Sequence, residues 1–292
     1  MRILPSVKCK LIACFFALCM QGHTMAQEPV QLLVRADDMG VNHEMNHGII
    51  RCYQEGIVTS ASIMPTSPYF GEAVRLCKEN PGLAVGIHLT LLGTRERPVL
   101  SPEEVPSLVT PQGFFHEDGV SLEKANPVPE EIERELRAQI GKVRATGLHF
   151  VYLDWHRTPP KVAQDIILKL CREQQLIYAQ GMGNDRVLDG GYRRTKVQPD
   201  RVTEKHELPG GHTFYYPASH YTEEVKQSFF EALSTLAPGR WWGNTHPGLY
   251  DAKGDLTALL CDPRTLEIIK RRNIQLVSYA DLWQEKYGKG KH

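Results

Sequence analysis

The strongest constraint on the fold is a regular alternation of short apolar runs with longer amphipathic stretches. Runs typical of buried strands occur at residues 30–36, 57–64, 83–91, 148–156, 176–183, 240–248 and 274–282. Stretches with helical spacing lie between them, at residues 45–56, 69–82, 128–147, 162–175, 222–239 and 262–273. This alternation predicts parallel strands covered by helices. Seven such units favour a single-domain α/β fold, a (β/α) barrel that is closed, distorted or partly open, over a two-domain open sheet.

The first 26 residues differ in character from the rest of the chain. Arg2, Lys8 and Lys10 precede an apolar run at residues 11–20, and small residues lie around Ala26. The apolar run is too short to span a bilayer. This pattern predicts a secretory signal peptide at residues 1–26 rather than an uncleaved anchor. Residues 27–292 would then form one secreted or periplasmic domain without stable membrane insertion.

The charge balance excludes one class of partner. The chain of 292 residues has 34 basic and 34 acidic residues, and its formal net charge is +0. A balance of this kind provides no basic surface for nucleic acid. The sequence leaves the oligomeric state open.

The cysteines do not indicate a metal or redox motif. Outside the predicted signal peptide the chain has Cys52, Cys77, Cys171 and Cys261, none of them in a CxxC pair. Each lies in a helix-like stretch beside apolar residues, which favours buried free thiols. A disulfide remains open, because a secreted protein would permit one.

Two adjacent acids, Asp37 and Asp38, follow the first apolar run. Neighbouring strand residues point to opposite faces of a sheet, so one acid would be driven into the core if the strand continued. We therefore expect the strand to end there and to open into a loop. In parallel barrels the functional residues lie at such carboxyl ends of strands.

Other chemically capable residues also fall at predicted strand ends. His88 ends the third run, Asp154 and His156 end the fourth, and His246 ends the sixth. Each alone is a weak signal, since a lone histidine is more often structural and Asp38 could cap the following helix. Their convergence is more informative. A carboxylate and two imidazoles form a metal ligand set with open positions, and a further carboxylate and histidine can move protons.

These residues lie in motifs that resemble those of the YdjC/ChbG-like carbohydrate deacetylase family. The motifs, in order, are "LLVRADDMG", "GIHLTL", "HFVYLDWH", "THPG" and "LLCDPRTLEIIKRRNIQLVSYADL", and the resemblance covers about residues 30–284. It implies a (β/α) barrel related to that of the NodB-type polysaccharide deacetylases. It also implies a divalent metal and removal of acetyl groups from N-acetylated sugars or oligosaccharides.

The resemblance also implies a role for each site residue. Asp38, His88 and His156 would bind the metal, for which zinc or magnesium is expected and manganese remains open. Asp37 would be the general base. His246 would protonate the leaving amine or support the tetrahedral intermediate. Asp154 would orient the site from behind the ligands.

The sequence departs from the family pattern after the third ligand. Trp155 replaces a small residue, Arg157 follows His156, and Pro159–Pro160 stand where a later histidine is common. Trp155 and Arg157 are therefore expected to contact substrate or support the site. Aromatic candidates for stacking on sugar rings are Trp155, Tyr215, Tyr216, Trp241 and Trp242, although alternation should bury one of the last two.

The missing histidines keep two other functions open. One is a metal-dependent hydrolase that acts on another amide or on an ester. The other is a catalytically silent sugar-binding barrel.

Overall fold

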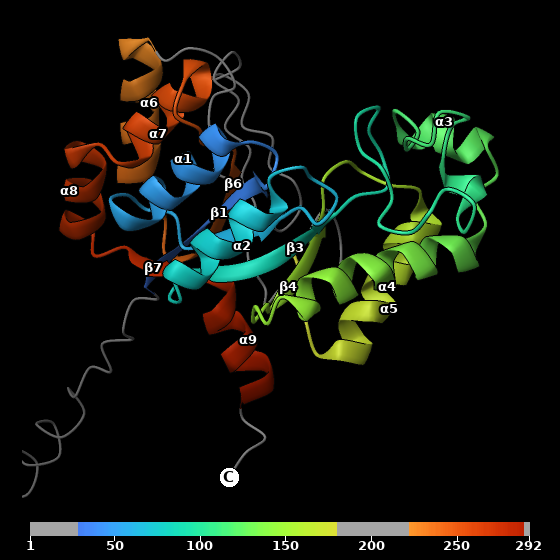
Figure 1. Ribbon diagram of the computed structural model, residues 1–292. Helices are drawn as coiled ribbons and strands as arrows, with labels where there is room; N and C mark the ends of the chain where they lie inside the picture. Colours follow the sequence, from blue (N-terminus) through green and yellow to red (C-terminus); the bar gives the residue numbers. More distant parts are fainter. Residues whose placement is uncertain (1–28, 180–221, 289–292) are drawn as a thin grey trace, which may run out of the picture.

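The computed structural model describes residues 29–179 and 222–288 (Figure 1). The predicted signal peptide, as well as Tyr215 and Tyr216, lies outside the described residues, so these assignments remain predictions. No helix within the described ranges has the length and apolar character needed to cross a membrane.

A parallel sheet forms the centre of the fold (Figure 1). Its strands are β1 (Val30–Met39), β2 (Ser60–Ile63), β3 (Ala84–Leu89), β4 (Tyr152–Trp155), β5 (Ile177–Tyr178), β6 (Gly239–Thr245) and β7 (Gln275–Val277). The order across the sheet is β5-β4-β3-β2-β1-β6, and β7 also pairs with β1. Every one of these pairings is parallel.

The sheet is a half-barrel, which confirms the predicted α/β class and the parallel strands. Within the described residues no pairing joins β5 to β6. Closure into a complete seven-stranded barrel therefore stays a prediction.

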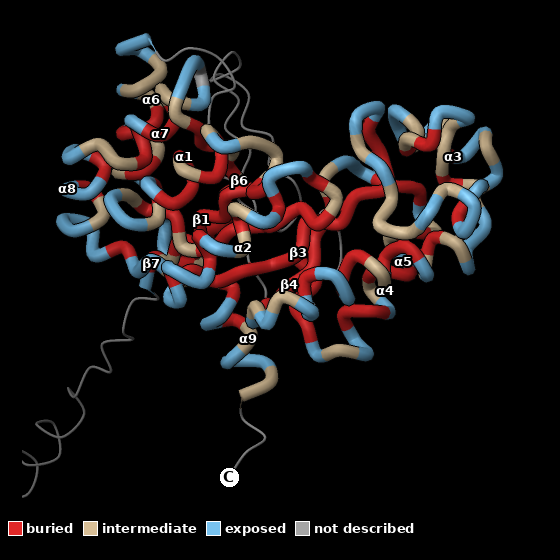
Figure 2. The backbone as a smooth tube through the Cα atoms, in the orientation of Figure 1, coloured by how far each residue is buried: buried red, intermediate tan, exposed pale blue. Residues whose placement is uncertain are grey.

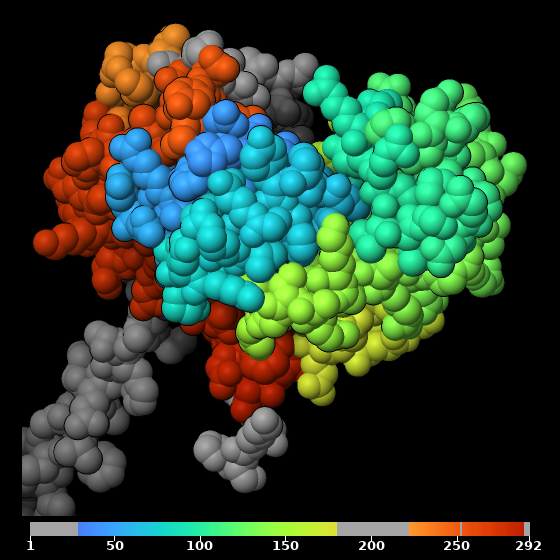
Figure 3. All heavy atoms as spheres, in the orientation of Figure 1, coloured from blue at the N-terminus to red at the C-terminus, as the bar shows by residue number. Residues whose placement is uncertain are grey.

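Helices surround the sheet. They are α1 (His43–Gln54), α2 (Phe70–Glu79), the 3-10 turn η1 (Pro106–Leu108), α3 (Gly119–Lys124), α4 (Pro129–Ala145), α5 (Lys161–Gln174), α6 (Glu223–Ser234), α7 (Asp251–Leu260), α8 (Pro263–Arg271) and α9 (Tyr279–Tyr287). Strands β1 to β6 are largely buried, whereas β7 is exposed at Gln275 and Leu276, and the helices expose their outer faces (Figure 2). The segment around α3 projects to one side of the sheet, beside α4 and α5 (Figure 3).

Local sequence signals explain several helix ends. Pro129 begins α4 and the acids Glu130 and Glu131 occupy its first turn, as predicted. The Thr222 side chain caps α6 by accepting a hydrogen bond from the Val225 amide. The cap of α1 is Asn42, so the alternative reading of Asp38 as a helix cap is wrong.

Two parts of the C-terminal region differ from the prediction. Residues 274–282 were expected to form one strand, but β7 ends at Val277 and α9 begins at Tyr279. The reason is a capping box at Ser278, whose side chain and that of Asp281 exchange hydrogen bonds with each other's backbone amides. The helix α7 was not predicted at all.

Both tryptophans of β6 are buried, at 8% and 6% exposed. Trp241 packs in the main core, and Trp242 packs in a second cluster with Tyr279 and Leu282 of α9. Trp155 is buried as well. The expectation that these side chains form an exposed sugar-stacking rim is therefore wrong, because helices cover both faces of the sheet.

The four cysteines are free thiols in the structure. Cys52, Cys77 and Cys171 are buried as predicted, whereas Cys261 is only half-buried at the end of α7. The Sγ atoms of Cys52 and Cys261 lie 4.0 Å apart.

A buried polar network joins α4 to the loop after β3. The Glu135 carboxylate accepts hydrogen bonds from the backbone amides of Val99 (2.8 Å) and Leu100 (3.0 Å). It also accepts one from Gln139, whose side chain in turn bonds both the amide and the carbonyl of Thr90. Burial raises the pKa of Glu135. The network thus holds the chain after His88, at Thr90 and at Val99–Leu100, against α4.

Replacing this buried carboxylate should destabilise the fold. In Glu135→Gln one of the two backbone amides faces an amide NH₂ instead of an oxygen, and the loss should be about 1–3 kcal/mol in the free energy of unfolding. Urea denaturation followed by circular dichroism measures it. Glu130→Gln, on the exposed start of the same helix, is the matched control. Equal stability of the two variants would contradict the assignment.

Candidate metal centre

Strand β1 continues through both acids instead of ending before them. Its pairing with β2 shifts register between Ala36 and Met39, and Asp38 has a φ of 65°. This local irregularity is a β-bulge, which re-aims side chains without ending a strand. Aspartate is one of the few residues that tolerate such a φ. The expectation of a strand end is therefore wrong. The bulge, and not a strand end, lets the two side chains point to different places: Asp37 is buried, while Asp38 lies at the rim.

Below the rim, Arg35 holds two buried carboxylates. Its guanidinium donates to Asp37 from Nε (2.6 Å to Oδ1) and from the second terminal nitrogen (2.8 Å to Oδ2). Its other terminal nitrogen lies 3.0 Å from Asp154 Oδ2. Arg35 is 1% exposed, and its charged end lies over the Trp242 ring, 5.1 Å from the centroid. The three side chains form one rigid ion cluster.

The cluster shifts the ionisation of its members. Burial alone would raise the pKa of Asp37, but the charge of Arg35, the charge of His88 and the hydrogen bonds from Arg35 together outweigh it, and the pKa is lowered. Burial would likewise lower the pKa of His88, yet the carboxylates of Asp154, Asp38 and Asp37 together raise it to about 10. One guanidinium faces two carboxylates, which leaves one negative charge unbalanced. That charge favours a cation at the His88 ring, which is either a proton on Nε2 or a metal bound in its place.

The rim side chains meet at Asp38. Its Oδ1 atom lies 3.2 Å from Nε2 of His88 and 3.9 Å from Nε2 of His156. Its Oδ2 atom lies 3.9 Å from Nε2 of His246. The structure thus brings together all four of these predicted site residues, which come from β1, the end of β3 and the segments that follow β4 and β6.

The atoms that converge at this point suit a metal. Asp38 Oδ1 and His88 Nε2 are buried and, within the described residues, make no hydrogen bond. The two atoms face each other at 3.2 Å, and a proton or a metal between them would satisfy both. Asp154 Oδ1 lies 2.9 Å from Nδ1 of His88 and so leaves Nε2 of that ring to face Asp38. A carboxylate behind a ligating histidine is the usual arrangement in metal sites.

A second group of possible metal ligands consists of Asp37, His88 and Asp154, whose ligand atoms also lie close together. Its carboxylate oxygens are already bonded, however. Arg35 takes both oxygens of Asp37, and Asp154 also accepts a hydrogen bond from Ser62 (2.7 Å). A cation there would also be repelled by Arg35. Asp38, His88 and His156 therefore remain the predicted ligand set.

Other residues of the region have different places. Trp155 is buried against Tyr178, with ring centroids 5.6 Å apart. Arg157 is exposed. His156 is half-buried, and burial lowers its pKa. Its imidazole therefore favours the neutral form that a metal requires.

The sequence analysis did not single out Arg35, Ser62 or Asn244. Asn244 donates to Asp37 (3.3 Å), and Ser62 links Asp154 to Tyr152. A signal for Arg35 was available: a charged residue inside an apolar strand, two positions before Asp37 and thus on the same face, needs a buried partner.

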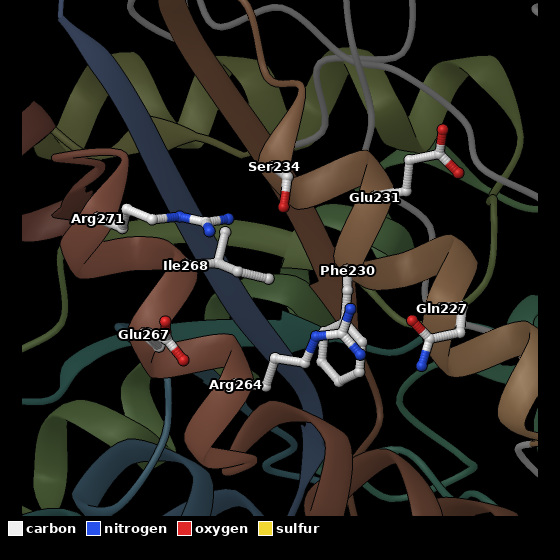
Figure 4. A pocket seen from close by; sticks show the side chains of 8 residues that line it. All are labelled: Gln227, Phe230, Glu231, Ser234, Arg264, Glu267, Ile268 and Arg271. Atoms are coloured by element: carbon white, nitrogen blue, oxygen red, sulfur yellow. The ribbon is translucent and has the colours of Figure 1, made fainter.

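A hollow of about 260 Å³ lies elsewhere, between α6 and α8 (Figure 4). It is lined by Phe230, Arg264 and Arg271 among others, and Arg264 lies over the Phe230 ring at 4.4 Å. It contains none of the candidate site residues.

Removing the central cation should be costly. Arg35→Met leaves Asp37 and Asp154 buried without their partner, and we expect a loss of about 3–5 kcal/mol in the free energy of unfolding. Arg75→Met, which breaks the exposed pair with Glu79, should cost less than about 0.5 kcal/mol. Chemical denaturation of both variants measures the difference. A loss in Arg35→Met no larger than that in Arg75→Met would show that the cluster does not stabilise the fold.

Known proteins are similar to this chain in sequence. A carbohydrate deacetylase from Geobacillus stearothermophilus is 29% identical over 271 residues, which cover 88% of this chain and 99% of the relative. One from Brevibacillus brevis is 43% identical over 150 residues, which cover 50% of this chain and 58% of the relative. That second match therefore spans less than two thirds of its relative's length.

A solved structure agrees with these relatives. An Enterococcus faecalis V583 protein named for cellobiose-phosphate cleavage superimposes with a TM-score of 0.67 and 26% identity, covering 87% of this chain and 99% of that one. The sequence pattern of the family described as YdjC-like protein matches residues 31–276. This match includes every residue of the candidate metal centre, and the chain belongs to the YdjC-like family.

Proposed function

We propose that the chain is a metal-dependent hydrolase that removes acetyl groups from N-acetylated sugars or oligosaccharides. One observation carries the proposal: the Nε2 atoms of His88, His156 and His246 converge on the carboxylate of Asp38, at 3.2, 3.9 and 3.9 Å, and the buried Asp37 directly precedes Asp38 in the chain. Relatives named carbohydrate deacetylase support the substrate class. The predicted signal peptide would place the activity outside the cytoplasm.

Asp38, His88 and His156 would hold the metal. A carboxylate and two imidazoles suit zinc, and magnesium is the alternative. When bound, a divalent metal activates water and polarises a carbonyl group. Asp154 keeps the His88 ring in position, with Nε2 directed at Asp38.

Asp37 would accept the proton from the attacking water. Arg35 and Asn244 fix the orientation of its carboxylate, and its lowered pKa keeps it ionised at neutral pH. Within the described residues Oδ1 of Asp37 accepts one hydrogen bond, from Arg35, and so keeps a lone pair that could take a proton. Adjacent acids thus serve two purposes because the bulge separates their directions.

His246 would donate a proton to the leaving nitrogen of the sugar. His246 faces Oδ2 of Asp38, whereas His88 faces Oδ1. The His246 side chain is 44% exposed, so a substrate can reach it. Arg157 is exposed beside His156 and is a candidate for substrate contact. Trp155 would support the site from the core instead of touching sugar.

Acetate release from N-acetylglucosamine oligomers tests the proposal. With zinc, magnesium or manganese added, the wild type should release acetate. Asp37→Asn should lower kcat by about 10²–10⁴-fold, because a general base contributes that much. His88→Ala should abolish activity, and His149→Ala, at an exposed histidine outside the site, should leave it unchanged.

Other outcomes would identify other functions. Hydrolysis of esters or other amides, without acetate release from sugars, would indicate a different metal-dependent hydrolase. Sugar binding without metal and without turnover would indicate a silent binding barrel. Full activity in both Asp37→Asn and His88→Ala would contradict the mechanism.

Metal removal gives a separate prediction. Dialysis against a chelator should abolish acetate release, because the remaining groups supply only proton transfer. Adding back one divalent metal at a time should restore it and rank the metals. Circular dichroism before and after dialysis controls for unfolding. Undiminished activity of protein shown to be metal-free by elemental analysis would rule out metal dependence.

A further inference from the structure

We propose that the chain has a second transition-metal site, formed by His43 and His47 of α1 and Glu72 of α2. It shares no residue with the candidate metal centre and does not depend on the proposed function. The site would bind zinc, or another divalent metal that prefers imidazole, at the surface of the protein.

The first observation is the spacing on α1. The sequence "HEMNH" spans His43 to His47, and α1 begins at His43, so both histidines lie on a single helical turn. Residues four apart lie on the same helix face. The two rings are adjacent, with centroids 4.2 Å apart. Paired histidines at this spacing on a helix are a known zinc-binding arrangement, although the spacing alone is a weak signal.

The second observation is independent of the spacing. Glu72 comes from another helix and completes the set: its Oε1 atom lies 2.8 Å from Nδ1 of His43 and 3.6 Å from Nε2 of His47. Ligand atoms of a tetrahedral zinc lie about 3.3 Å from one another. The donors are thus already near the required separation, and two imidazoles with one carboxylate leave a fourth position open.

The third observation is the support behind Glu72. Asn46 is fully buried and donates from Nδ2 to Glu72 Oε2 (2.7 Å), which leaves Oε1 turned toward the histidines. The other end of the Asn46 amide accepts a hydrogen bond from the Gly40 amide (2.6 Å). Such groups behind a ligand are usual in metal sites, and removing one weakens binding about 10–100-fold.

The ligand types determine the class of metal. Two imidazoles favour zinc, nickel or copper over magnesium and calcium, which prefer oxygen. Both histidines are accessible, with side chains 54% and 36% exposed, so a metal can enter without opening the fold. The Asn46 amide also connects this site to the segment just after Asp38, so a metal bound here would stiffen that segment.

Zinc stoichiometry of the untagged, metal-stripped protein tests the proposal. Native mass spectrometry should detect two zinc ions in the wild type and one in the double variant His43→Gln/His47→Gln. The double variant His88→Gln/His156→Gln should retain the zinc that the first variant loses. His149→Gln, at an exposed histidine of neither site, is the control. Calorimetric titration should show a loss of at least about tenfold in affinity for Glu72→Gln.

The two metal sites can fail separately. If only the second site is real, the wild type binds one zinc and His43→Gln/His47→Gln binds none. If His43→Gln/His47→Gln and Glu72→Gln both keep the wild-type stoichiometry and affinity, the second site is refuted. Glu72→Gln also decides the matter if circular dichroism shows that the double variant is unfolded. Magnesium should not compete with zinc at this site, and displacement by equimolar magnesium would contradict the assigned class of metal.

Discussion

A single guanidinium between two buried carboxylates is the interaction on which the rim of the sheet depends. Arg35 of β1 contacts Asp37 of the same strand and Asp154 of β4, and Asp154 holds His88 of β3. Asn244 of β6 contacts the same Asp37. Four strands therefore meet at one cluster of charges. Buried charges are tolerated only when they are paired, so the strands cannot shift past each other without unpairing them. The rigidity of the cluster sets the positions of the groups above it.

The site was largely predictable because its residues lie at strand ends in a parallel α/β pattern. His88, His156 and His246 could be placed at one rim with no knowledge of contacts, since carboxyl ends of parallel strands share an edge. Which atoms face each other could not be predicted. The 3.2 Å approach of Asp38 to His88 depends on a bulge, and a bulge has no signature in "RADDMG". Ser62 was missed because a lone serine in a strand gives no signal of a buried partner.

The secondary structure was predictable where the hydrophobic periodicity is strong. It was poorly predictable where one short motif sets the boundary between two elements. The amphipathic pattern of α4 and the proline that starts it sufficed to locate that helix. At residues 274–282 the apolar character of Ile274 to Val277 was extended too far, because the capping box at Ser278 was not recognised. The burial of both Trp241 and Trp242 could not be seen from alternation, which shows that two faces exist but not that helices cover each of them.

The φ of 65° at Asp38 restricts the residue types that position 38 tolerates. Asparagine tolerates this backbone conformation nearly as well as aspartate, whereas glutamate and alanine do not. The proposed role as a metal ligand and a backbone requirement thus coincide in one residue. On a regular strand a substitution of aspartate by glutamate mainly moves the carboxylate oxygens. At position 38 the same substitution would also strain the backbone of the bulge. An exchange to asparagine removes the charge alone, so it separates the electrostatic role of the residue from its conformational one.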